Sequence, residues 1–181
     1  ALGFSGYLAG LFPGIDIITG AVVLIISAAF LLSYGVKEST RAAIIGTLIE
    51  AAGLILIIFL GIPYLGSIDY FEPPDVPGVL SAAALIFFAY IGFEQIARLA
   101  EETKNPAKNI PKAIVFAVIF TSIIYVLVAI SSISILSPEL LAVSNAPLAD
   151  VAAKAFGPEA HILLSIIALF ATANTVLLIQ L

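Results

Sequence analysis

The sequence predicts an all-α membrane protein. Its 181 residues are 62% hydrophobic and only 10% charged, whereas a soluble domain carries about 25% charged residues. The mean hydropathy is +1.21, and the apolar residues gather in runs. About 20 consecutive apolar residues suffice for a helix to cross a bilayer. A soluble fold of this size could not cover so much apolar surface, so the runs are expected to be transmembrane helices.

The first part of the chain predicts a helix tail and two spans. Residues 1–12 are too short to cross a bilayer and are expected to be the tail of a helix that begins upstream. Residues 15–34 and 42–62 are each long enough for a full span. The polar residues 35–41 are expected to form a short loop between them.

The second part predicts three further spans. A loop over 63–78, rich in acidic residues and proline, precedes an interrupted span over 79–100. A clean span over 112–136 is expected to begin around Pro111, because proline is tolerated in the first turn of a helix. The last span covers 158–181. Two short helices are expected before it, one starting at Ser137-Pro138-Glu139 and one over Pro147–Phe156 that ends at Gly157.

The positive charges predict the orientation. Lys and Arg in short loops mark the cytoplasmic side of a membrane protein. Six of the seven cations fall in two loops that lie two spans apart, and therefore on one side: Lys37, Arg41, Arg98, Lys104, Lys108 and Lys112. The sequence therefore predicts a multi-pass protein of the cell membrane. Its expected cytoplasmic loops are 35–41 and 101–111, and its expected extracellular loops are 63–78 and 137–157.

The composition argues against several classes of protein. With no cysteine and one histidine, neither a disulfide framework nor a Cys- or His-based metal cluster is expected. The sequence has no basic tract, which argues against nucleic-acid binding. The sequence contains neither a phosphate-binding loop nor residues that could converge as catalytic groups, so neither an enzyme nor a cofactor is expected. The chain contains no methionine and opens and stops inside apolar runs, so we expect it to be an excerpt of a longer protein.

The most informative segment is the interrupted span. Its apolar part, 79–93, would be only about 22 Å long as a helix, short of a hydrocarbon core of about 30 Å. To cross, the span must continue through Glu94, and a charge inside a span usually marks a pathway or a binding site. Gly92 lets the backbone leave helical geometry there. Transporters use such broken helices to aim backbone groups at a substrate.

The same segment resembles a known family. An aromatic and acidic core is followed by an acidic pair and two proline-containing motifs: Phe88, Ala89, Tyr90, Gly92, Phe93 and Glu94, then Glu101-Glu102, Lys104-Asn105-Pro106 and Ile110–Ile114. This pattern is similar to the sixth transmembrane helix and the following loop of the amino acid–polyamine–organocation permeases. The order of the other spans is similar too, so the resemblance runs from the end of the third helix through most of the eighth.

The resemblance implies a fold and a function. The fold would be a leucine-transporter-type bundle of two inverted five-helix repeats, of which residues 1–181 form a single partial transmembrane domain. The function would be secondary active transport of an amino acid or a related amine by alternating access, driven by protons, within a lipid bilayer. The substrate's amino group would meet carbonyls at the break near 91–94. Its carboxylate would meet the break in the first helix, which lies outside this chain.

The resemblance also implies substrate-binding residues. An aromatic side chain at Phe88 would cover the substrate. Glu94 would begin the second half-helix, where free N–H groups and the helix dipole stabilise a carboxylate. The alternatives are that Glu94 caps a helix and pairs with Arg98, and that Phe88 faces lipid or packs. The candidate segment is Phe88, Ala89, Tyr90, Ile91, Gly92, Phe93 and Glu94.

Glu50 stands out from composition alone, because it lies inside an apolar span. A carboxyl group in a bilayer is costly and often takes part in transport. The alternative is that Glu50 extends toward the cytoplasm or forms a static bond with a neighbouring helix. Several proton-coupled permeases carry lysine at this place, so the coupling ion stays open between H⁺ and Na⁺. Thr172, Asn174 and Thr175 form a polar cluster in the last span, and Thr172 and Asn174 are candidates to meet Glu50. The alternative for the cluster is ordinary interhelical hydrogen bonding.

Two further interpretations remain open. The polar residues are structural if the protein is a channel-like or scaffold subunit of the membrane, and saturable uptake would distinguish a transporter from it. A membrane-embedded enzyme is disfavoured because no paired acids or metal-ligand spacing occur. Gly46 and Gly53 are expected to be close-packing positions.

Overall fold

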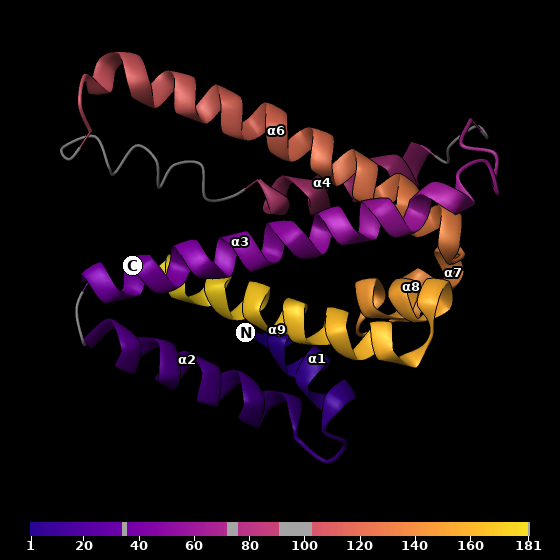
Figure 1. Ribbon diagram of the computed structural model, residues 1–181, viewed down its shortest axis with the longest axis horizontal. Coiled ribbons are helices and arrows are strands. Elements are labelled where there is room, and N and C mark those ends of the chain that lie inside the picture. Colours follow the sequence, from indigo (N-terminus) through magenta and orange to yellow (C-terminus); the bar gives the residue numbers. More distant parts are fainter. Residues whose placement is uncertain (34–35, 72–75, 91–102, 181) are drawn as a thin grey trace. The chain divides into compact units, whose positions relative to one another are not determined.

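Figure 1 shows the computed structural model of residues 1–181, which describes all residues except 34–35, 72–75, 91–102 and 181. The described residues form helices and turns and contain no strand, which confirms the all-α prediction. They divide into two compact units: Ala1–Ile68 with Val128–Leu181, and Asp69–Leu127. Each unit is treated separately below.

The first unit is arranged around one central helix. α9 packs against α1, α2, α3 and α8. The elements of this unit are α1 (Leu2–Leu11), α2 (Ile17–Ser33), α3 (Val36–Gly61), the 3₁₀ turn η1 (Ile62–Tyr64), the end of α6 (Pro106–Ile135), α7 (Pro138–Val143), α8 (Pro147–Phe156) and α9 (Pro158–Gln180).

α2 is shorter than the span predicted over 15–34. The Asp16 carboxylate accepts hydrogen bonds from the backbone N–H and the hydroxyl of Thr19, at 2.9 and 3.1 Å. A side-chain cap of this kind satisfies the free N–H groups at a helix start, so the helix begins at Ile17. Its 17 residues make about 25 Å at 1.5 Å per residue, less than the thickness of a hydrocarbon core.

α3 is longer than predicted, because it begins at Val36 rather than at residue 42. The polar residues 37–41 include Lys, Glu and Arg, which are good helix formers. With no proline or glycine before the apolar run, the helix continues through both. The prediction of a loop over 35–41 is therefore wrong for the part from Val36 onward.

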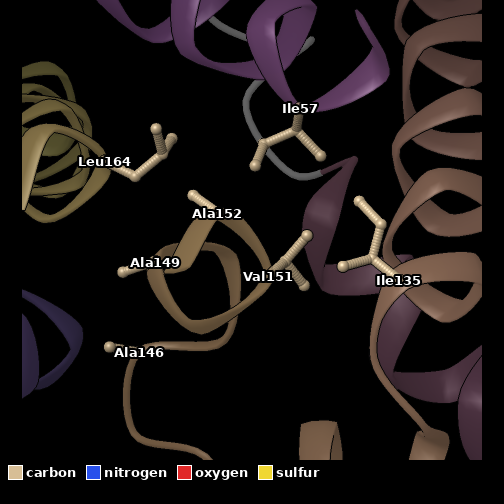
Figure 2. Packing of buried hydrophobic residues seen from close by; sticks show 7 residues of the cluster. All are labelled: Ile57, Ile135, Ala146, Ala149, Val151, Ala152 and Leu164. Carbon is tan, nitrogen blue, oxygen red and sulfur yellow. The ribbon is translucent and has the colours of Figure 1, made fainter. Parts of the chain in front are cut away.

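The core of the first unit forms around α8 (Figure 2). Val151 points toward Ile57 and Ile135, while Ala149 and Ala152 lie on the side of Leu164. Ile57, Ala149, Val151 and Ala152 are fully buried. α8 ends at Gly157, whose φ of +91° is a conformation that glycine adopts without strain. The small side chains of α8 thus let it sit inside the packing of the longer helices.

The second unit contains α4 (Val76–Ala89) and the first part of α6 (Pro106–Ile135). α6 begins at Pro106, which fits the first turn of a helix. The carbonyl of Asn105 accepts bonds from the amides of Lys108 and Asn109, at 3.1 and 3.0 Å. Pro111 therefore lies inside the helix. The expectations that the helix begins around Pro111, and that 101–111 is entirely a loop, are wrong on this point.

Three described helices are long and apolar enough to cross a membrane: Arg41–Tyr64, Pro106–Ile135 and Pro158–Gln180. They correspond to the spans expected over 42–62, 112–136 and 158–181. The short helices α7 and α8 lie where the proline and glycine pattern places them.

Candidate functional site

Glu50 lies near the middle of α3, where its side chain lines a cavity of about 170 Å³. Tyr7 from α1 and Thr172 from α9 line the same cavity. The other lining residues are apolar or glycine: Gly53, Leu54, Leu148, Leu164, Ile167, Ala168 and Ala171. Three polar side chains from three helices therefore meet around one small, mostly apolar space inside the first unit.

Thr172 is already hydrogen-bonded within its own helix. Its hydroxyl donates to the carbonyls of Ala168 and Leu169, at 2.7 and 3.2 Å. A hydroxyl oxygen has two lone pairs besides its one hydrogen, so Thr172 keeps the capacity to accept a hydrogen bond or to ligate a cation. Thr172 and Glu50, both candidates from the sequence, lie at the same cavity.

Asn174 is occupied elsewhere, in a contact between α9 and α3. It is only 5% exposed, and its amide lies 3.1 Å from the Thr47 hydroxyl. If the amide oxygen and nitrogen are exchanged, the amide bonds Thr47 and the Ala43 carbonyl, so its partners lie on α3 in either orientation. The backbone of Gly46 leaves room for this contact, since a Cβ there would lie 2.6 Å from Asn174 Cγ. Asn174 therefore serves helix packing.

Asn174→Ala is expected to destabilise the protein by about 0.5–2 kcal/mol, because it removes an interhelical hydrogen bond and leaves Thr47 with one partner fewer. Thermal unfolding in detergent measures the loss. Thr175→Ala is the matched control, since the exposed Thr175 hydroxyl bonds only the Ala171 carbonyl of its own helix. A change in the ion dependence of uptake, without a loss of stability, would contradict the packing role.

The candidate substrate segment is described only in part. α4 ends at Ala89, and the amide of Tyr90 bonds the Phe87 carbonyl at 3.2 Å. The side chains of Phe88 and Ala89 lie outside the described residues, as do Ile91, Gly92, Phe93 and Glu94 entirely. Their predicted roles, and the predicted break, remain predictions.

Tyr90 contacts α6. Its hydroxyl lies 2.7 Å from Ser122 Oγ, and Ser122 in turn donates to the Val118 carbonyl at 2.7 Å. The ring of Tyr90 meets Tyr125 edge-on, with centroids 5.7 Å apart and planes at 72°. Such aromatic pairs contribute about 0.5–1.5 kcal/mol beyond area burial. The end of α4 is thereby attached to α6 within the second unit.

Two features of the site were not predicted. Tyr7 lies in a segment expected only as a helix tail, where no polar pattern marks it. The pairing of Asn174 with Thr47 joins residues 127 positions apart, and nothing in the local sequence indicates it. Among the residues that the structure describes, no three His, Asp or Glu side chains converge as a metal site would require.

Comparisons with known proteins cover almost the whole chain. The family model described as amino acid permease matches residues 1–180. Branched-chain amino acid permease BcaP of Bacillus subtilis (strain 168) is 40% identical over 111 residues, which are 60% of this chain and 24% of that protein.

Two further relatives match a larger share of this chain at lower identity. The methylthioribose transporter of Bacillus subtilis is 33% identical over 150 residues, 72% of this chain and 32% of that protein. Cationic amino acid transporter 7, chloroplastic, of Arabidopsis thaliana is 30% identical over 151 residues, 77% of this chain and 26% of that protein. The chain thus spans between 24% and 32% of the length of these relatives.

Proposed function

The chain belongs to the amino acid permease family, and from this premise we propose that it is part of a longer secondary transporter that carries an amino acid or a related amine by alternating access. The match over residues 1–180 is the observation that carries the proposal. The names of the relatives support the substrate class. One of them names methylthioribose, which widens the substrates to be tested beyond amino acids.

The substrate would bind at residues 88–94. In this proposal, carbonyls near the end of α4 accept hydrogen bonds from the substrate's amino group, Phe88 covers the substrate, and Glu94 follows at the start of the next half-helix. The attachment of Tyr90 to Ser122 and Tyr125 supports the proposal in one respect. It holds the last turn of α4 in place, and a preorganised binding segment loses less entropy when its ligand binds.

Coupling would take place at Glu50. The carboxyl group lies near the middle of the apolar span Arg41–Tyr64, where an ionised group is costly. It would bind a proton from one side of the membrane and release it to the other as the bundle changes state. If the coupling ion is Na⁺ instead, the Glu50 and Thr172 oxygens are suitable ligands for a hard cation. The packing of Asn174 against Thr47 leaves Glu50 and Thr172 as the favoured coupling pair.

We place this protein in the cell membrane, with the regions 35–41 and 101–111 on the cytoplasmic side. The segments 63–78 and 137–157 would then face outward. The bias of Lys and Arg toward the first two regions supports this orientation.

Uptake into proteoliposomes tests the proposal. The full-length protein should take up at least one of a panel of labelled branched-chain amino acids, cationic amino acids and methylthioribose, with saturation. Uptake should accelerate under an inward proton gradient, because protonation of Glu50 drives the cycle. Parallel vesicles with only a sodium gradient identify the coupling ion. Non-saturable flux would instead indicate a channel, and no flux of any substrate on the panel would contradict the proposal.

A further inference from the structure

The cavity at Glu50 is bordered by α1 and α8. Tyr7 from α1 and Leu148 from α8 both line it, and the Tyr7 hydroxyl approaches the backbone of Leu148. Tyr7 is half-buried against the core cluster around α8. Among the described residues of α1, Tyr7 is the one that places a titratable group at this cavity.

A second cavity lies along the same two helices. It measures about 400 Å³ and is lined by Gly6, Ala9 and Gly10 of α1, by Ile17 of α2, by Asn145 and Ala146 just before α8, and by Asp150 of α8. Gly6 lines this cavity, and the next residue of α1, Tyr7, lines the cavity at Glu50. α1 and α8 therefore border both cavities, with Asp150 on one and Tyr7 on the other.

Asp150 is held in place by its neighbours. The Ser144 hydroxyl donates to its Oδ2 at 2.5 Å, and His161 Nε2 lies 3.4 Å from its Oδ1. Ser144 itself accepts from the Ala146 amide at 3.0 Å. The other ring nitrogen of His161, Nδ1, lies 3.5 Å from the hydroxyl of the buried Ser165. The side chains of His161 and Asp150 remain 27% and 42% exposed, so protons can exchange there with water.

We propose that His161, Asp150 and Tyr7 form the outer access route by which the coupling proton reaches Glu50. The inference rests on the proposed function and orientation. The titratable groups along the route come from four helices: Tyr7 of α1, Glu50 of α3, Asp150 of α8 and His161 of α9. Ser144, which follows the last residue of α7, contributes only a hydroxyl.

The proton would move by successive transfers between these groups. His161 takes a proton from outer water and passes it to the Asp150 carboxylate. Asp150 then gives a proton, through bridging water, to the Tyr7 oxygen, while the Tyr7 hydroxyl gives its own proton to the Glu50 carboxylate. The net change is one proton moved from water to Glu50, with only N–H and O–H bonds broken and formed. A cavity of about 170 Å³ also has room for bridging water between Tyr7 and Glu50.

Tyr7→Phe tests the route in the full-length protein in proteoliposomes. The variant keeps the ring that packs and removes the hydroxyl that would carry the proton. We expect proton-driven net uptake to slow by about 10-fold or more, as loss of a proton-transfer group does elsewhere. Substrate exchange, which needs no net proton movement, should fall far less. Asp150→Asn and His161→Gln should change the same ratio.

Tyr64→Phe is the matched control, because Tyr64 also packs against the core cluster but is absent from the lining of both cavities. This variant should leave both net uptake and exchange unchanged. If Glu50→Gln abolishes proton-driven uptake while Tyr7→Phe and Asp150→Asn retain the full rate, the route is overturned and Glu50 stands. If Tyr7→Phe lowers exchange and net uptake equally, its role is structural and the route is overturned. A wild type that is driven by sodium and not by protons overturns the route, while the proposed transport function stands.

Discussion

Glu50→Gln is expected to abolish the accumulation of substrate under an imposed pH gradient, while exchange of labelled for unlabelled substrate remains measurable. Glutamine keeps the shape of glutamate and removes its titration. The side chain lines a cavity whose other polar groups are a tyrosine and a threonine. Neither of these replaces a carboxyl group that must bind and release a proton near neutral pH. Gradient-driven accumulation should therefore fall to the level of empty vesicles.

The measurement compares uptake under a proton gradient with uptake under a sodium gradient, for wild type and for both Glu50→Gln and Glu50→Asp. Aspartate restores the titrating group on a shorter stem and should restore part of the accumulation. Glu159→Gln at the exposed start of α9 removes a carboxylate of the same type outside the cavity and should have no effect. A Gln variant that still concentrates substrate under the proton gradient would show that coupling occurs elsewhere.

Gly61→Ala is expected to destabilise the first unit by about 1–3 kcal/mol or more, the range for overpacking a well-packed interior. A Cβ at Gly61 would contact Ser131 Cβ and lie 2.5 Å from its Oγ and 2.8 Å from its Cα. The last of these is a backbone atom and cannot turn aside. The end of α3 would have to move away from α6, which also strains the 3.5 Å contact of the Ser131 hydroxyl with the Ile58 carbonyl.

Thermal unfolding in detergent and yield from the membrane report the effect of Gly61→Ala. Gly10→Ala serves as the control, because a Cβ at Gly10 meets nothing within 4 Å and alanine favours the helix. Small residues at helix contacts in membranes allow close approach of the backbones. Equal stability of the two variants would mean that the close approach at Gly61 contributes little to the fold.

The long helices could be predicted because a bilayer imposes one strong requirement on the sequence, an apolar run of sufficient length. Their ends could not, because these depend on single residues. Asp16 caps α2 and shortens it, and Pro106 begins α6 five positions before Pro111. In both cases single residues at the edge of the apolar run, rather than the run itself, decide where the helix starts.

The candidate site could be predicted only where the polarity of a residue differs sharply from that of its neighbours in the sequence. Glu50 does so, because it is an acid within an apolar run. Tyr7 does not, since tyrosine is common in membrane helices, and only the packing of α1 against α9 brings it to the cavity. Tyr90 was predicted for its place in a motif, but its bond to Ser122 joins residues 32 positions apart. Contacts over such distances depend on the fold.

The buried face of α8 would oppose the passage of ions. Ala149, Val151 and Ala152 have no exposed surface, and they leave little space for water in the packing beside the two cavities. A bare ion entering such a region loses its hydration shell at a cost of several kcal/mol. In the proposed transporter, this packing would suppress uncoupled leak of charge. Passage would be left to a group such as a tyrosine hydroxyl, which carries a proton without carrying net charge.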